Sequence, residues 1–303
     1  MQALMTVFHK ELADNFTSWK GIILFIMVLL VGVLVVLAPS GALDNIRATL
    51  VAPTQFIFLK IFTASGEASP SFLWFFAMIV IPIVGIILGL DAINSEKSSG
   101  TLSRLLSQPI YRDAVINGKF LAGTVTLAIM LTTTMLVVSG IGLAELGVPP
   151  TSEETARILL FWGASILYGA FWLGLSMLFS VCFERVATSA LSSIAIWVFF
   201  LFYTITGFIA GQTQNPEATI LAMRASPLFL FQESMNVILV PGARTISEYL
   251  QLSVAPARFI PGPLSLGQTL LTIWPHMAII GGVTTALFAI SYVKFMREEI
   301  RST

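Results

Sequence analysis

Six apolar runs, each long enough to cross a membrane, constrain the fold of this chain more than any other feature. None of the six contains Asp, Glu, Lys or Arg, and they cover residues 21–38, 72–90, 120–144, 158–183, 187–211 and 270–293. About 20 residues of α-helix cross a hydrocarbon core of about 30 Å. With 56% hydrophobic residues, the chain holds more apolar side chains than a soluble core needs. We therefore expect an all-α polytopic membrane protein with six transmembrane helices, in one domain over residues 1–303.

The segments outside these runs predict shorter helices. Residues 1–20 carry apolar side chains at three- and four-residue spacing, which predicts an amphipathic helix at the membrane interface, although a plain extension of the first span fits equally well. Residues 212–269 contain six prolines and two apolar pieces, 226–240 and 246–254, that are too short to span. These two pieces predict short helices that dip into or lie on the outer leaflet. Pro82 and Gly85 predict a kink in the second span.

The distribution of Lys and Arg predicts the orientation. If the chain crosses six times, ten of its sixteen Lys and Arg residues lie on the side that holds both termini, the 91–119 loop and the short turn at 184–186. The positive-inside rule places that side in the cytoplasm. We expect a multi-pass protein of the cell membrane with both termini cytoplasmic and residues 212–269 outside. The net charge of zero gives no sign of a nucleic-acid partner.

Several chemistries are missing from the sequence. Carriers driven by an ion gradient usually place carboxylates near the midplane, and these spans have none. Gly118 and Lys119 lack the rest of a phosphate-binding loop, the two histidines are far apart, and no nucleophile elbow is present. We expect no metal, no cofactor bound by this chain and no catalytic residue. Any transport here must be powered by another polypeptide.

Residues 91–119 are the only long polar interruption with a dense, mixed charge pattern. Within them, Thr101–Ser107 predicts a short amphipathic helix that Pro109 ends, and a second helix begins at Asp113 and continues into the third span. Two helices meeting at a proline turn could be pushed by a soluble partner. A solvated loop with routine positive-inside charge is the alternative by spacing alone.

This loop also carries a family resemblance. Asp91-Ala92-Ile93, Ser99-Gly100-Thr101-Leu102 and Gly118-Lys119-Phe120 resemble permease subunits of type-2 ABC exporters, in the branch that includes the membrane subunit of the nitrous-oxide reductase maturation transporter. The resemblance continues through Pro261-Gly262-Pro263-Leu264-Ser265 to the tail at 295–300. It implies six spans, short re-entrant helices between spans 5 and 6, a dimer that is most simply a homodimer, and two ATPase subunits that bind ATP and magnesium.

The resemblance further implies which residues touch the ATPase. The loop between spans 2 and 3 is the coupling helix of that family, and the turn between spans 4 and 5 is a smaller contact. Carried over to this chain, the coupling residues are Glu96, Gly100, Thr101, Leu102, Arg104, Leu105, Pro109, Arg112, Glu184 and Arg185.

A path between the two protomers would run along spans 2 and 5. The candidate lining residues are aromatic, hydroxyl-bearing or otherwise uncharged, which suits an amphipathic or lipid-like substrate: Phe75, Phe76, Met78, Tyr203, Thr204, Thr206 and Phe208. Each of them could instead pack against a neighbouring helix or face lipid. The competing function is a scaffold or mechanotransmitter that uses the same ATPase to act on an outer partner without transport.

Overall fold

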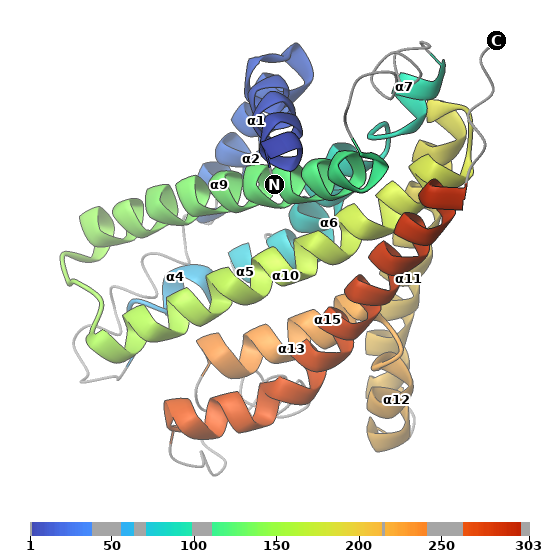
Figure 1. The fold of residues 1–303 in the computed structure, drawn as a ribbon. Helices are drawn as coiled ribbons and strands as arrows, with labels where there is room; N and C mark the ends of the chain where they lie inside the picture. The colour runs from blue at the N-terminus through green and yellow to red at the C-terminus, as the bar shows by residue number, and fades with distance from the viewer. Residues whose placement is uncertain are drawn as a thin grey trace.

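The computed structural model describes residues 2–37, 56–63, 71–98, 111–213, 216–240 and 263–297, and these residues form helices and no strand. Figure 1 shows their arrangement. The elements in chain order are α1 (Gln2–Thr17), α2 (Trp19–Leu37), α4 (Lys60–Thr63), α5 (Phe72–Phe75), the π-helix η1 (Phe76–Val80), α6 (Ile81–Gly89), α7 (Asn94–Ser98), α9 (Arg112–Leu146), α10 (Ser152–Cys182), α11 (Val186–Thr213), α12 (Pro216–Met223), α13 (Pro227–Leu239) and α15 (Leu266–Arg297).

The prediction of six spanning helices is confirmed. Six helical segments are long and apolar enough to cross a membrane: α2, the segment from α5 to α7, α9, α10, α11 and α15. Several of them extend beyond the predicted bounds: the second segment ends at Ser98, α9 begins at Arg112, α10 begins at Ser152, and α15 covers Leu266–Arg297. The earlier start of α10 has a local cause, because Thr151 and Glu154 form a capping box around the first turn.

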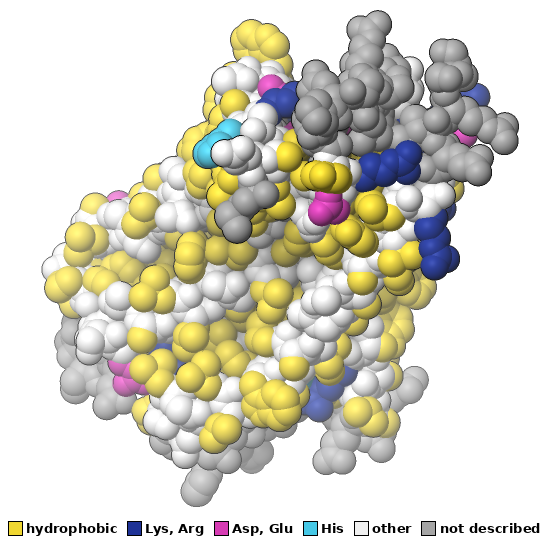
Figure 2. All heavy atoms as spheres, viewed as in Figure 1, with side chains coloured by type: hydrophobic (Ala, Val, Ile, Leu, Met, Phe, Trp, Pro, Cys, Tyr) yellow, Lys and Arg dark blue, Asp and Glu magenta, His cyan; other side chains and the backbone are white. Residues whose placement is uncertain are grey.

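The bundle has two polar ends. The first, which we call the α7 end, holds α1, α7, the start of α9 and the last turns of α10 and α15 (Figure 1). The second, which we call the α13 end, holds the start of α10, the start of α15 and the C-terminal part of α13. In Figure 2 the charged side chains stand toward these two ends, and the band between them is mostly hydrophobic or uncharged.

The predicted kink in the second span is a π-helical turn just before Pro82. Proline has no N–H, so it cannot bond the carbonyl oxygen four residues earlier, which belongs to Met78. Trp197 of α11 donates its indole N–H to that oxygen at 2.9 Å. Tyr168 of α10 donates its hydroxyl to the neighbouring Ala77 oxygen at 3.0 Å. Two other spanning helices therefore satisfy the carbonyls that the kink leaves free, as helix breaks in a membrane require.

Close packing of α6 on α10 fixes the middle of the bundle. A Cβ on Gly85 would lie 2.7 Å from the Gly169 oxygen, and one on Gly89 would lie 2.7 Å from the Leu173 oxygen. Only glycine permits the two backbones to approach this closely, which is how small residues drive helix association in membranes.

The predicted short helix at 226–240 is α13, and it lies inside the protein. Every residue from Leu228 to Leu239 is buried, and the helix packs between α10 and α15. Its buried carboxylate, Glu233, accepts two hydrogen bonds from Arg224 at 2.9 Å each, and His276 of α15 lies 3.4 Å away. The second predicted piece, 246–254, lies outside the described residues.

A fully buried arginine joins several segments by hydrogen bonds at the α13 end. Arg157 of α10 donates to the backbone oxygens of Ile238 and Leu264, to the Thr269 hydroxyl and to the Glu153 carboxylate. These groups come from the end of α13, from the segment before α15 and from α15 itself. From the sequence we expect residues 145–157 to be a short link that leads into the fourth span; in the structure α10 already begins at Ser152, and Arg157 is fully buried.

Candidate functional site

The predicted coupling loop is described only at its two ends. Glu96 in α7 and Arg112 at the start of α9 lie within the described residues. The remaining loop residues of the prediction lie outside them: Gly100, Thr101, Leu102, Arg104, Leu105 and Pro109. The site that can be built from atoms is therefore the base of the loop, where the polar groups of four helices meet.

The base of the loop is attached to the end of α10. The first backbone N–H groups of a helix have no partner within the helix. At α7, the N–H groups of Ile93 and Asn94 both donate to the Ser180 hydroxyl oxygen, at 2.9 and 3.2 Å. Lys97 donates to the Val181 carbonyl oxygen at 3.2 Å. A hydroxyl on α10 thus supplies the cap that α7 lacks in its own sequence.

Apolar contacts seal the same junction. Ile93 is fully buried in a cluster of side chains that come from α1, α9, α10 and α15: Val7, Val115, Ile116, Met177, Val181 and Phe295. Arg112 adds a long contact, 3.5 Å from its Nη1 to the Met296 oxygen, between the start of α9 and the end of α15. The base of the loop is therefore packed against α1, α9, α10 and α15.

A network of charges surrounds the base of the loop. The Lys119 ammonium of α9 lies 2.9 Å from Oε1 of Glu11 in α1 and 2.9 Å from Oε1 of Glu96 in α7. Lys10 lies 3.1 Å from Glu11 and 3.9 Å from Glu96. Lys119 is almost fully buried, while Glu11 and Glu96 are partly shielded. One ammonium therefore connects three helices.

Electrostatics favours the charged state of Glu11. Burial raises the pKa of this carboxyl, but the ammonium groups of Lys119 and Lys10 outweigh burial and hold its pKa below the usual value. At Lys10, burial lowers the pKa, yet the carboxylate of Glu11, with help from Glu96 and Asp14, raises it above the usual value. Both side chains are thus charged at neutral pH.

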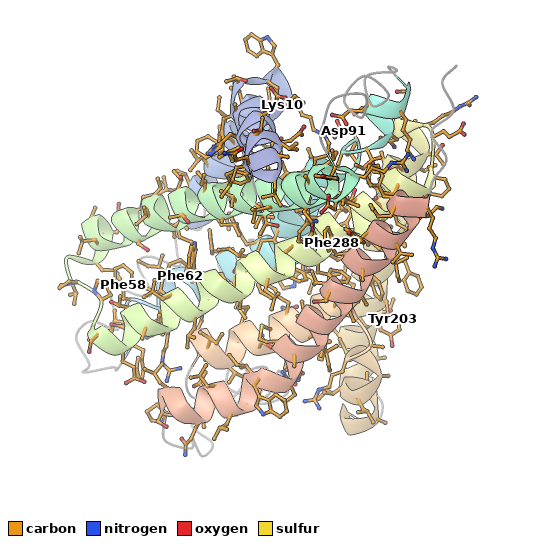
Figure 3. The ribbon with its side chains drawn as sticks, in the orientation of Figure 1. Lys10, Phe58, Phe62, Asp91, Tyr203 and Phe288 are labelled. Atoms are coloured by element: carbon orange, nitrogen blue, oxygen red, sulfur yellow. The ribbon has the colours of Figure 1, made fainter. Side chains whose placement is uncertain are left out.

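α1 belongs to this site, which the sequence did not indicate. Gly118 of α9 lets α1 approach closely, since a Cβ there would lie 2.9 Å from a Val7 methyl carbon. Asn15 donates to the Thr126 hydroxyl at 3.0 Å. Lys20, at the start of α2, holds both oxygens of Asp91 at 2.8 Å. Figure 3 labels Lys10 and Asp91 at this end of the molecule.

The predicted minor contact lies in the expected tight turn. Glu184 and Arg185 separate α10 from α11, and both side chains are exposed. This turn is at the α7 end, because the preceding residues Ser180 and Val181 contact α7. The described base of the loop and this turn therefore lie at the same end of the bundle.

The proposed path-lining residues lie in two different environments. Phe76 and Met78 are buried in the core, and Phe75 is half-buried against it. On α11, Tyr203 donates to the Ala222 oxygen at 2.8 Å, Thr204 bonds the Ser226 hydroxyl at 3.0 Å, and Phe208 packs on Phe229. Thr206 is exposed and bonds its own helix. A role in lining a path stays a prediction for all seven.

Comparison with known proteins gives a consistent assignment. The family described as "ABC-2 family transporter protein" matches residues 5–300. A probable ABC transporter permease protein, NosY, of Pseudomonas aeruginosa is 28% identical over 206 residues, which are 66% of this chain and 68% of that protein. The protein of the same name in Stutzerimonas stutzeri is 29% identical over 135 residues, 43% of this chain and 46% of that one.

Proposed function

Since the chain belongs to the ABC-2 family of transporter proteins and is a multi-pass membrane subunit of an ABC transporter, we propose that it is the permease of an ATP-driven exporter. In this proposal it forms the path as a homodimer in the cell membrane, with both termini in the cytoplasm. Two separate ATPase subunits bind ATP and magnesium and push on the 91–119 loop, with a smaller contact at Glu184 and Arg185.

The observation that carries the proposal is the attachment of the loop base. Ser180 caps α7 from α10, and Lys119 joins α7 to α9 and α1. A force applied to the loop beyond Ser98 would reach α10, α9 and α1 through hydrogen bonds and ion pairs of 2.9 to 3.2 Å. A solvated loop without a mechanical role would not need such an anchor. The attachment of the loop base therefore favours a role of this loop in coupling to the ATPase.

The test is ATPase stimulation in the reconstituted complex. Leu102→Asp and Gly100→Pro should abolish the stimulation of the partner ATPase by the permease, while the protein still inserts and elutes as a single species. Leu221→Asp is the matched control, because Leu221 is an exposed leucine on α12, distant in sequence from the loop. Normal stimulation in both loop variants would refute the coupling role. Transport in liposomes without ATP would refute the exporter.

A further inference from the structure

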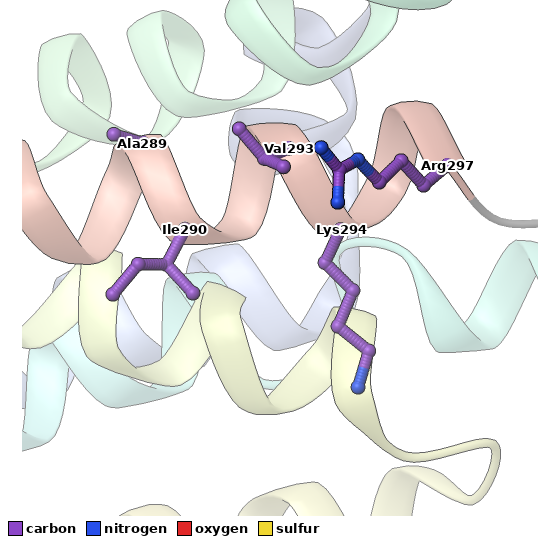
Figure 4. Close-up of a pocket in the computed structure, with 5 residues that line it drawn as sticks. All are labelled: Ala289, Ile290, Val293, Lys294 and Arg297. Atoms are coloured by element: carbon purple, nitrogen blue, oxygen red, sulfur yellow. The ribbon is translucent and has the colours of Figure 1, made fainter.

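A hollow lies on the exposed side of α15, near its C-terminal end. It has a volume of about 630 Å³, and the described residues that line it all come from the last third of this helix: Ala289, Ile290, Val293, Lys294 and Arg297. Figure 4 shows them, with the apolar side chains toward the middle of the helix and the two cations toward its C-terminal end.

Small residues extend this hollow toward the middle of the bundle. Gly282, Ala286, Ala289 and Val293 are exposed and follow one another at three- and four-residue spacing, which places them on one face of the helix. A Cβ on Gly282 would meet no atom within 4 Å. The described part of the chain leaves this apolar strip uncovered, and we call the strip and the hollow together the trough.

The cations at the end of the trough differ from three lysines at the same end of the bundle. Lys10, Lys20 and Lys119 at the α7 end each have a carboxylate partner. Lys294 and Arg297 are exposed, and within the described residues neither has an ion pair or a side-chain hydrogen bond. Two positive charges are thus available where the apolar face ends.

We propose that this trough binds one anionic phospholipid, with the phosphate at Lys294 and Arg297 and an acyl chain along Ala289 and Ala286. From Ala286 to Arg297 the helix rises about 16 Å, which is about half of a hydrocarbon core of about 30 Å. The site therefore matches the depth of one leaflet. Positive-inside charge alone would account for two exposed cations but not for the trough beneath them.

The test measures phosphatidylglycerol that remains on the full-length protein in detergent, by native mass spectrometry, after exposure to mixed phosphatidylcholine and phosphatidylglycerol vesicles. Removing both charges with Lys294→Gln and Arg297→Gln should lower retained phosphatidylglycerol about 25-fold, since each cation near an anionic headgroup contributes about fivefold. Ala289→Trp should lower it without changing any charge, because the indole fills the trough. Arg185→Gln is the control: it removes an exposed cation from the same end and should change nothing.

Four outcomes would overturn the proposal. An equal loss in Arg185→Gln would mean that retention follows general surface charge. Unchanged retention in Ala289→Trp would mean that no acyl chain occupies the trough. Displacement of the lipid by inorganic phosphate at millimolar concentration would identify a phosphate site without a lipid tail. A change of oligomeric state in Ala289→Trp, seen by light scattering, would assign the trough to a second protein chain.

Discussion

The helices at the two polar ends of the bundle are held together by different charged groups. At the α13 end, one buried guanidinium binds two backbone oxygens, a hydroxyl and a carboxylate. At the α7 end, the ammonium groups of the almost fully buried Lys119 and of the exposed Lys20 bind carboxylates of other helices. A planar guanidinium holds fixed directions, whereas an ammonium on a flexible stem can exchange one carboxylate for another. The difference indicates a fixed α13 end and an α7 end whose helices can change partners.

The largest expected effect is at Arg157. Arg157→Met should destabilise the protein by about 3–5 kcal/mol, because it leaves buried acceptors of three segments without a donor. Thermal unfolding in detergent measures this change, and Arg185→Met, at an exposed position, is the control. A loss of stability below about 1 kcal/mol would mean that this residue does not hold the α13 end together. The inferred difference between a fixed α13 end and a changeable α7 end would then be wrong.

A smaller effect is expected at Lys119. Lys119→Met removes the buried ammonium that Glu11 and Glu96 share and leaves them only the more exposed Lys10. We expect a loss of about 2–3 kcal/mol at neutral pH, below the range for a fully buried pair. Lys119→Arg keeps the charge and should recover most of the loss. Thermal unfolding of both variants in the same detergent gives the comparison.

The pH dependence distinguishes this electrostatic cause from simple loss of packing. In the natural protein the pKa of Glu11 is lowered from 4.5 in the fold, so its contribution to stability is complete above pH 4.5 and is lost as the pH falls through the lower folded value. In Lys119→Met, only Lys10 still opposes the effect of burial on Glu11. Burial and the nearby Glu96 carboxylate should then raise the pKa of Glu11 in the folded state, so stability should increase as the pH falls from 7 to 5. A flat profile in the variant would contradict the ion network.

The capping hydroxyl of α10 gives a local effect. Ser180→Ala leaves two buried N–H groups of α7 unpaired, and we expect about 1–2 kcal/mol of local destabilisation. Amide hydrogen exchange at Ile93 and Asn94 should become about tenfold faster with little change in global unfolding. Ser291→Ala is the control, because that buried serine bonds only its own helix. Equal acceleration in both variants would refute the cap.

The smallest effect is expected at Lys20. Its ion pair with Asp91 is substantially exposed, and exposed pairs contribute about 0–1 kcal/mol. Lys20→Gln should therefore change the thermal midpoint very little, and less at high salt. A loss as large as that of Lys119→Met would mean that the two pairs belong to one cooperative network.

Much of the helix bundle could be predicted because a spanning helix must be apolar along its length and must pair its backbone N–H and C=O groups. Charge-free runs located the six spans, and Pro82 indicated where the second span departs from a regular α-helix, since a missing N–H leaves the carbonyl four residues earlier without its partner. The resemblance in the Asp91–Lys119 segment led to the family that matches residues 5–300.

The contacts between helices were harder to predict. In α1 the apolar spacing predicted an amphipathic helix at the membrane interface, yet Val7, Glu11 and Asn15 contact α9, and Val7 is the one buried residue of the helix. Apolar side chains are as well solvated by lipid as by protein, so hydrophobic spacing in a membrane does not identify which face meets another helix. Arg157 was missed for a related reason: a charge at the end of a span usually lies at the interface.

The bond from Trp197 to Met78 also restricts how the molecule can move. If α11 separated from the second span, the Met78 carbonyl would be left unpaired in hydrocarbon, which costs several kcal/mol. In any transport cycle these two helices should therefore travel as one rigid body. Relative sliding is then expected at boundaries that no such bond crosses, and a disulfide joining α11 to the second span should leave turnover intact.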